Sequence, residues 1–209
     1  MLGYTNALGI NPLREAISRN YAKKYGVDVS PDRVIITTGS SAAFLFAFLG
    51  CFDIGDHVAL ASSGYPCYRN IMSATSIVYQ SIPVNSDFKL TAVELAEEVE
   101  RREKAKLPKL KGLILSSPSN PTGAMLSPVE LESLCRFCDD HSIRFLSDEI
   151  YHGISYGKKE STAVAYSENA IVINSFSKYY SMTGWRLGWM IVPEVLVDTM
   201  NRLSQNMYM

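Results

Sequence analysis

The segment AIVINSFSKYYSMTGWRLGWMIV, residues 170–192, decides the fold class of this chain. Two apolar, β-rich runs at 170–174 and 187–192 enclose a polar stretch that has no helical pattern. A parallel crossover normally needs a dozen or more residues and usually contains a helix. The second run is therefore predicted to return antiparallel to the first, as the last strand of the sheet.

The rest of the chain alternates β-rich runs with helical patterns, which is typical of a largely parallel sheet covered by helices on both faces. The predicted fold is a three-layer αβα arrangement with a mostly parallel, seven-stranded sheet in one domain, residues 1–209. The predicted strands are 34–38, 57–61, 76–82, 112–116, 143–147, 170–174 and 187–192. The predicted helices are 12–25, 41–51, 66–74, 92–106, 128–140 and 194–206.

The helix at 128–140 has the clearest start signal. Ser127 can cap it, Pro128 occupies its first position, and Glu130 completes a capping box. We therefore expect this helix to begin at residue 128.

Composition and charge exclude several classes of protein. The chain is 47% hydrophobic with a formal net charge of −1 and no long block of like charge, so neither a nucleic acid nor a membrane surface is an expected partner. Its beginning lacks a signal-peptide pattern, and the apolar run at 42–52 is too short to span a bilayer.

The four cysteines do not form a disulfide framework in a chain of this length, which favours a reducing compartment and a cytoplasmic location. Cys135 and Cys138 form a C-x-x-C pair on one face of a predicted helix. We interpret them as buried helix residues, with a redox pair as the alternative.

Polar and ionisable residues follow five of the predicted strands. In open α/β sheets, ligands bind outside the carboxyl ends of the strands, so these residues are expected to share one site. The segments that follow these strands are 39–41, 62–66, 117–123, 148–153 and 175–178.

One end of this site suits a phosphate. Ser40 and Ser41 open a helix, where backbone N–H groups and the helix dipole attract anions. Arg186 and Ser175 can add a charge-assisted contact and a hydroxyl contact to the same phosphate.

The other residues suit an aromatic ring with a cationic nitrogen. Tyr65 presents a ring that could stack, and a carboxylate at Asp148 is expensive to bury unless it pairs with a cation such as a protonated ring nitrogen. Lys178 is predicted to be a partly desolvated amine that forms a Schiff base. Pyridoxal phosphate is the cofactor that requires all of these partners.

Four motifs in order resemble the class I and II pyridoxal-phosphate-dependent aminotransferases, which have the aspartate-aminotransferase fold. They are YTNALGINPLREAI (4–17), SNPTG (119–123), DEIY (148–151) and SFSKYYSMTGWRLGW (175–189). The resemblance covers nearly the whole chain and matches the large, cofactor-binding domain of that family. It implies an amino-group transfer between an amino acid and a 2-oxo acid.

The resemblance also implies roles for single residues around the cofactor ring. Lys178 would carry the Schiff base and shuttle the substrate proton, and Asp148 would keep the ring nitrogen protonated. Tyr151 and Asn120 would hydrogen-bond the ring oxygen, and Tyr65 would stack on the ring.

The same resemblance assigns the phosphate and the subunit contact. Ser40, Ser41, Ser175 and Arg186 would hold the phosphate. Tyr4 would reach the phosphate of the neighbouring subunit, which implies a homodimer.

The family usually has an N-terminal segment before the first motif and a small domain after the last helix, and both are expected to be absent from residues 1–209. That small domain supplies the arginine that binds the substrate carboxylate, so an excised or truncated piece with impaired turnover is the favoured interpretation. A natural short form completed by a partner chain is an alternative.

Three other functions compete with this interpretation. A pyridoxal-phosphate-dependent lyase, such as a carbon–sulfur β-lyase or an aminocyclopropane-carboxylate-synthase-like enzyme, would share all of these motifs. A non-catalytic cofactor-binding module is disfavoured by the intact set of Lys178, Asp148, Tyr151 and Arg186. A nicotinamide dinucleotide domain is rejected, because only one glycine follows the first strand.

Overall fold

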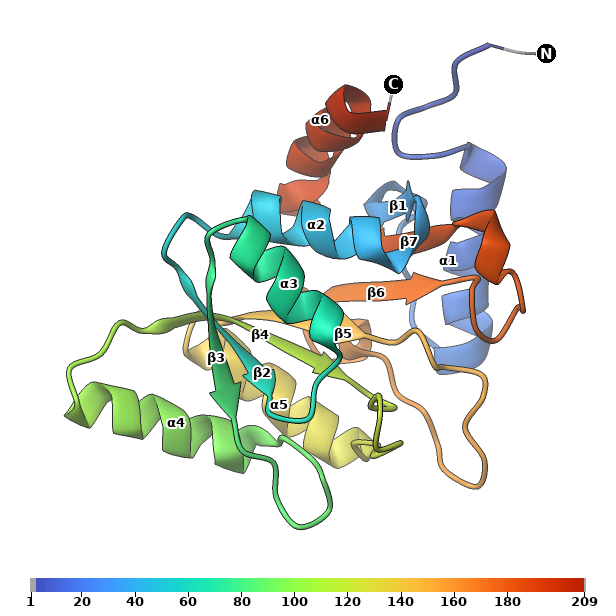
Figure 1. The fold of residues 1–209 in the computed structure, drawn as a ribbon. Coiled ribbons are helices and arrows are strands. Elements are labelled where there is room, and N and C mark those ends of the chain that lie inside the picture. The colour runs from blue at the N-terminus through green and yellow to red at the C-terminus, as the bar shows by residue number, and fades with distance from the viewer. Residues whose placement is uncertain (1–2, 209) are drawn as a thin grey trace.

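The computed structural model describes residues 3–208, which form one twisted sheet with helices on both faces (Figure 1). The order of the strands in the sheet is β1-β7-β6-β5-β4-β2-β3. The strands are β1 (Val34–Thr37), β2 (His57–Ala61), β3 (Val78–Ile82), β4 (Leu110–Ser116), β5 (Arg144–Asp148), β6 (Ile171–Ser175) and β7 (Gly188–Ile191).

The prediction for the last strand is confirmed. β7 pairs antiparallel with both β1 and β6. The other neighbouring pairs are parallel: β3 with β2, β2 with β4, β4 with β5, and β5 with β6. The polar stretch between β6 and β7 contains only a short 3-10 turn, Thr183–Trp185. The carboxyl ends of the parallel strands therefore open on one edge of the sheet, and this loop lies at that edge.

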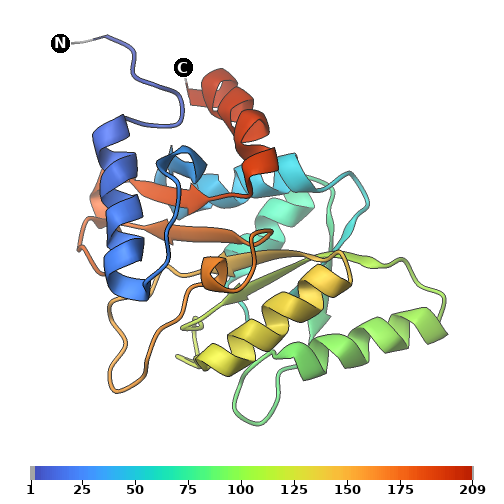
Figure 2. The ribbon, with the colours of Figure 1, turned by 180° about the vertical axis from the view of Figure 1, so that it is seen from behind.

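Two separate groups of apolar side chains pack the helices against the sheet. Side chains alternate between the faces of a strand, so Phe145 of β5 belongs to the group that includes residues of α1, α4 and α5, and Leu146 belongs to the group that includes residues of α2, α3 and α6. The helices are α1 (Asn11–Tyr25), α2 (Gly39–Cys51), α3 (Pro66–Ala74), α4 (Ala92–Lys104), α5 (Pro128–Asp140) and α6 (Val197–Tyr208). Seen from behind, the segment that leads into α1 and the last helix, α6, lie on the same side of the molecule (Figure 2).

The predicted start of α5 is confirmed in detail. Ser127 Oγ accepts from the Glu130 N–H at 3.3 Å, and the Glu130 carboxylate accepts from the Ser127 N–H at 2.6 Å. Lys89 binds the same carboxylate at 3.0 Å. α5 is thus fixed against the loop that precedes α4.

The interpretation of the C-x-x-C pair is also consistent with the structure. Cys135 and Cys138 are free thiols, both buried on the inner face of α5. Burial raises the pKa of both thiols, which disfavours the thiolate that redox chemistry needs. Within residues 3–208, none of the helices combines the length and the apolar character needed to cross a bilayer.

Candidate active site

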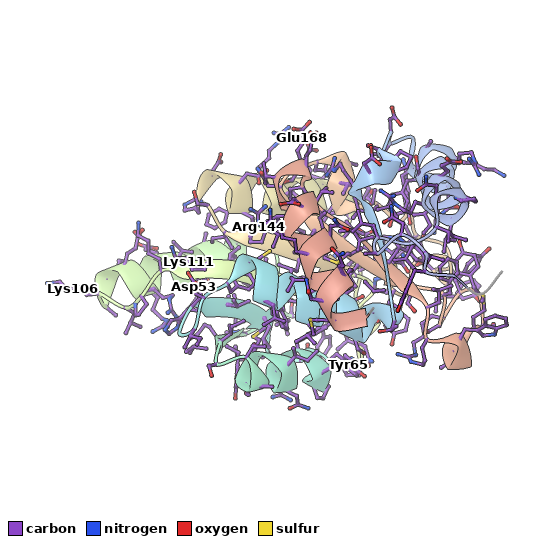
Figure 3. The ribbon with its side chains drawn as sticks, turned by 90° about the horizontal axis from the view of Figure 1, so that it is seen from above. Asp53, Tyr65, Lys106, Lys111, Arg144 and Glu168 are labelled. Atoms are coloured by element: carbon purple, nitrogen blue, oxygen red, sulfur yellow. The ribbon has the colours of Figure 1, made fainter. Side chains whose placement is uncertain are left out.

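A cavity of about 170 Å³ opens at the carboxyl edge of the sheet. It contains every predicted site residue except Ser175 and Tyr4. Figure 3 shows Tyr65, which lines the cavity, lying apart from Asp53, Lys111 and Arg144, which belong to the opposite edge. The lining residues are Ser40, Ser41, Phe44, Tyr65, Cys67, Tyr68, Asn120, Asp148, Ile150, Tyr151, Ser177, Lys178, Thr183 and Arg186.

Asp148 forms the buried end of the cavity. It is the last residue of β5 and is only 5% exposed. Its carboxylate accepts hydrogen bonds from the Tyr68 hydroxyl and, at 3.1 Å, from the Ile150 N–H. Burial raises the pKa of Asp148 to about 6, although both hydrogen bonds and the charge of Lys178 oppose the shift. A cationic ligand group in this cavity would stabilise the ionised carboxylate.

Asn120 and Tyr151 form one wall of the cavity. They come from the loops that follow β4 and β5, and the Asn120 amide donates to the Tyr151 hydroxyl at 3.2 Å. Two polar groups from neighbouring strand ends thus point to the same place, where they could bind an oxygen of a ligand.

Lys178 lies beside this wall, with Nζ 5.7 Å from the centroid of the Tyr151 ring. Lys178 as a whole residue is exposed, and the predicted partial desolvation of its amine stays a prediction. The amine reaches the cavity from its rim, where it is free to meet a ligand.

Arg186 and the start of α2 form the opposite end. Arg186 has a left-handed backbone conformation, with φ 49°, and its Nη1 donates to the Thr183 carbonyl at 3.1 Å. The guanidinium lies directly over Gly39, because a Cβ added there would come within 2.5 Å of Nη2. This contact explains why the helix begins with a glycine, two residues earlier than predicted.

The first turn of α2 has free donors at this end. Its N-cap, Thr38, makes no side-chain capping hydrogen bond. The beginning of β7 packs tightly against the same turn, since a Cβ on Gly188 would lie 2.9 Å from the Ser40 nitrogen. Ser40, Ser41 and Arg186 are therefore held together around a group of backbone N–H donors, as an anion site requires.

Ser175 is the last residue of β6, and its hydroxyl lies 3.0 Å from the Leu187 carbonyl and 2.8 Å from Ser177 Oγ. It braces the two ends of the β6–β7 loop, and Ser177 stands beside it in the cavity lining. The predicted contact between the Ser175 hydroxyl and a phosphate stays a prediction.

Tyr4 lies outside the cavity and is 90% exposed. Its predicted contact with a neighbouring subunit remains a prediction.

Tyr68 is the most important residue that the sequence analysis missed. Its hydroxyl holds Asp148 from the first turn of α3, three residues after Tyr65. The spacing of three residues on a predicted helix was the available signal, because it places Tyr68 close to Tyr65. Phe44, Cys67, Ile150 and Thr183 complete the lining without such a signal.

Residues 1–209 match the family model of aminotransferase class I and II over the whole chain. The chain belongs to this family. Its members use pyridoxal phosphate, which is the cofactor that the arrangement of charges in the cavity suggests.

Individual relatives agree with this family assignment. A valine–pyruvate aminotransferase from Mycobacterium tuberculosis is 50% identical over 98% of this chain and 52% of its own length. A (5-formylfuran-3-yl)methyl phosphate transaminase from Methanocaldococcus jannaschii is 38% identical over 98% of this chain and 52% of its own length. The chain thus spans about half the length of the curated relatives it matches.

Solved structures agree on the fold. The crystal structure of an aminotransferase from Mycobacterium tuberculosis superposes with a TM-score of 0.93 at 49% identity, over 100% of this chain and 53% of the other. A Thermus thermophilus aspartate aminotransferase mutant gives a TM-score of 0.89 at 28% identity, over 98% of this chain and 55% of the other. The seven-stranded sheet described above is therefore the aminotransferase fold.

Proposed function

We propose that residues 1–209 are the cofactor-binding domain of a pyridoxal-phosphate-dependent aminotransferase, which transfers an amino group between an amino acid and a 2-oxo acid. The observation that carries the proposal is the convergence of three charged groups on one small cavity. Asp148 occupies its buried end, Arg186 and the start of α2 its other end, and Lys178 its rim.

The cavity fits the chemistry of this cofactor at each end. The bare Cα of Gly39 leaves room for the Arg186 guanidinium beside the uncapped N–H groups of α2, as a phosphate would require. The buried carboxyl of Asp148 has a raised pKa, and a protonated ring nitrogen would stabilise its ionised form. The exposed ring of Tyr65 offers a stacking face.

When bound, pyridoxal phosphate would supply an electron-withdrawing ring for chemistry at the α-carbon of the amino acid. Lys178 would supply the amine that holds the cofactor and would then move a proton to and from the substrate. Asp148 would pair with the ring nitrogen, and Tyr151 and Asn120 would bind the ring oxygen. Ser40, Ser41 and Arg186 would hold the phosphate.

We further propose the partners and the setting of this reaction. The substrates are an amino acid and a 2-oxo acid, and the name of the 50% identical relative makes valine and pyruvate the first pair to assay. Tyr4, exposed near the chain start, contacts the second subunit of a homodimer in the cytoplasm.

The test is a product balance with the cofactor-loaded protein, valine and pyruvate, measured by mass spectrometry. Amino transfer predicts alanine and the 2-oxo acid of valine in equal amounts, without ammonia, and loss of both products in Lys178→Ala. A parallel reaction uses an S-substituted cysteine with no added 2-oxo acid, and release of ammonia, pyruvate and a thiol there would indicate a lyase and would overturn the proposal. If turnover is absent, formation of one 2-oxo acid of valine per chain, in a single round, still supports the proposal. If the 2-oxo acid of valine does not form at all, the proposal is refuted for this chain.

A further inference from the structure

His152 has contacts that the proposed reaction does not use. It directly follows Tyr151 of the cavity wall, yet its ring is buried and only 5% of the residue is exposed. Nε2 lies 2.9 Å from the Ser117 carbonyl, at the start of the loop after β4. Nδ1 lies 2.7 Å from the Tyr25 hydroxyl, at the end of α1. The imidazole thus bridges two segments that are far apart in the sequence.

The two partners determine the state of the ring. A carbonyl oxygen can only accept, so Nε2 carries the hydrogen that binds Ser117. Nδ1 of a neutral imidazole is then an acceptor, and the Tyr25 hydroxyl donates to it. Burial also lowers the pKa of His152, to about 4, so the neutral form is the native one. Glu149, Glu160 and Lys24 are the titratable groups that face it, and burial raises the pKa of Glu149 to about 8, which favours its neutral form.

Ser117 links this bridge to the cavity wall. Its carbonyl binds His152, while its N–H donates to the Asp148 carbonyl at 3.2 Å. Three residues later the same loop presents Asn120, whose amide donates to Tyr151. The distance between Asn120 and Tyr151 therefore depends on how the two loops are held together behind them.

Gly153 connects the bridge formed by His152 to the β6–β7 loop, which carries Lys178. It has φ +102°, and a Cβ added there would lie 2.5 Å from the ring of Tyr179, the residue after Lys178. The three consecutive residues thus have different neighbours. Tyr151 belongs to the cavity wall, His152 is buried in the protein interior, and Gly153 contacts the loop that carries Lys178. Fixing His152 fixes the position of all three.

We propose that His152 is a positioning residue: a neutral imidazole that ties the Ser117 loop to Tyr25 of α1, and so sets the Asn120–Tyr151 pair. This inference rests on the proposed function for its consequence, since that pair is the proposed binding group for the ring oxygen of the cofactor. A neutral imidazole suits the task because it carries one donor and one acceptor on opposite sides of a rigid ring. Phenylalanine would keep the volume of the ring and lose both contacts.

The test compares His152→Phe and Tyr25→Phe with His141→Phe as a matched control. His141 is an exposed histidine at the end of α5 that stacks on Phe137, outside the cavity. The first readout uses the protein without cofactor and follows the side-chain amide signal of Asn120 by NMR. We expect the signal to shift in both test variants and to stay in place in the control.

The second readout is the pH midpoint of the absorbance change of the bound cofactor. Weaker binding of the ring oxygen should raise this midpoint by about one unit in His152→Phe, which corresponds to a tenfold change in proton affinity. Tyr25→Phe should move it in the same direction by less, because the Ser117 contact remains. Thermal stability is recorded in parallel, since a purely structural role would lower it and leave the midpoint unchanged.

The two readouts separate the inference from the proposed function. An unchanged Asn120 signal in folded His152→Phe overturns the inference, whatever the cofactor does. If Tyr25→Phe alone is folded, its Asn120 signal decides in the same way. If the Asn120 signal shifts in the variants and the wild-type protein binds no cofactor, the bridge is supported and the proposed function is refuted.

Discussion

Gly39 gives a direct test of how the phosphate end of the cavity is built. It has φ +76°, and an added Cβ would lie 2.5 Å from Arg186 Nη2 and 3.1 Å from Cζ. Gly26, which ends α1, has nearly the same backbone conformation, with φ +71°, but has nothing within 4 Å of an added Cβ. Gly39→Ala and Gly26→Ala therefore share the backbone strain and differ in the clash with Arg186.

The expected magnitudes follow from these two terms. Forcing alanine into a left-handed conformation costs about 1–2 kcal/mol, so both variants should lose that much free energy of unfolding. Gly39→Ala must also move the guanidinium, which Thr183 holds at 3.1 Å. Losing one charge-assisted contact to a phosphate costs about 1.5–3 kcal/mol, or at least about tenfold in the Kd of the cofactor.

Two measurements on both variants check these values. Urea unfolding without cofactor gives the stability change, and spectroscopic titration with pyridoxal phosphate gives the Kd. We expect similar losses of stability in both variants and a higher Kd in Gly39→Ala alone. If Gly39→Ala binds the cofactor as tightly as the wild type and Gly26→Ala do, Arg186 does not hold the phosphate from the position described here.

Three further predictions concern Asp148, its partner Tyr68, and the cap of α5. The folded protein without cofactor keeps a proton on Asp148 up to about pH 6, whereas the unfolded chain releases it near pH 3.8, the ordinary pKa of an aspartate. The free energy of unfolding therefore falls by about 3 kcal/mol as the pH rises through this window. Asp148→Asn should lack this part of the pH dependence in urea unfolding between pH 4 and 7, and identical profiles would contradict the burial argument. Tyr68→Phe removes a hydrogen bond that lowers the pKa of Asp148, so the same window should extend to higher pH, and a window moved to lower pH would be the opposite result. Ser127→Ala should cost about 1 kcal/mol in urea unfolding and leave the cofactor Kd unchanged, and an equal loss of binding would show that α5 supports the cavity.

The sequence was sufficient for the sheet because each strand is a short apolar run with a clear boundary. The observed strands begin and end within two residues of the predicted bounds. The direction of β7 also followed from the sequence, since the stretch before it has no room for a crossover helix. β4 begins earlier than predicted, at Leu110, where the pairing with β2 shifts register beside His57.

The position of the site was predictable, and the direction of single side chains was not. The rule that ligands bind at the carboxyl ends of strands placed most of the cavity lining correctly. It could not show that Ser175 Oγ points to Leu187, because two nearby serines in a loop look alike in sequence. It also could not show the Tyr68–Asp148 contact, which depends on how α3 packs on the sheet.

The central claim is that Lys178 is the amine that binds the cofactor. The most direct measurement is to incubate the protein with pyridoxal phosphate, reduce it with borohydride, and map the modified lysine by peptide mass spectrometry. The account predicts a pyridoxyl group on Lys178 alone, at about one per chain, and none on Lys178→Ala. An absence of modification, or modification scattered over surface lysines such as Lys106 and Lys111, would contradict it.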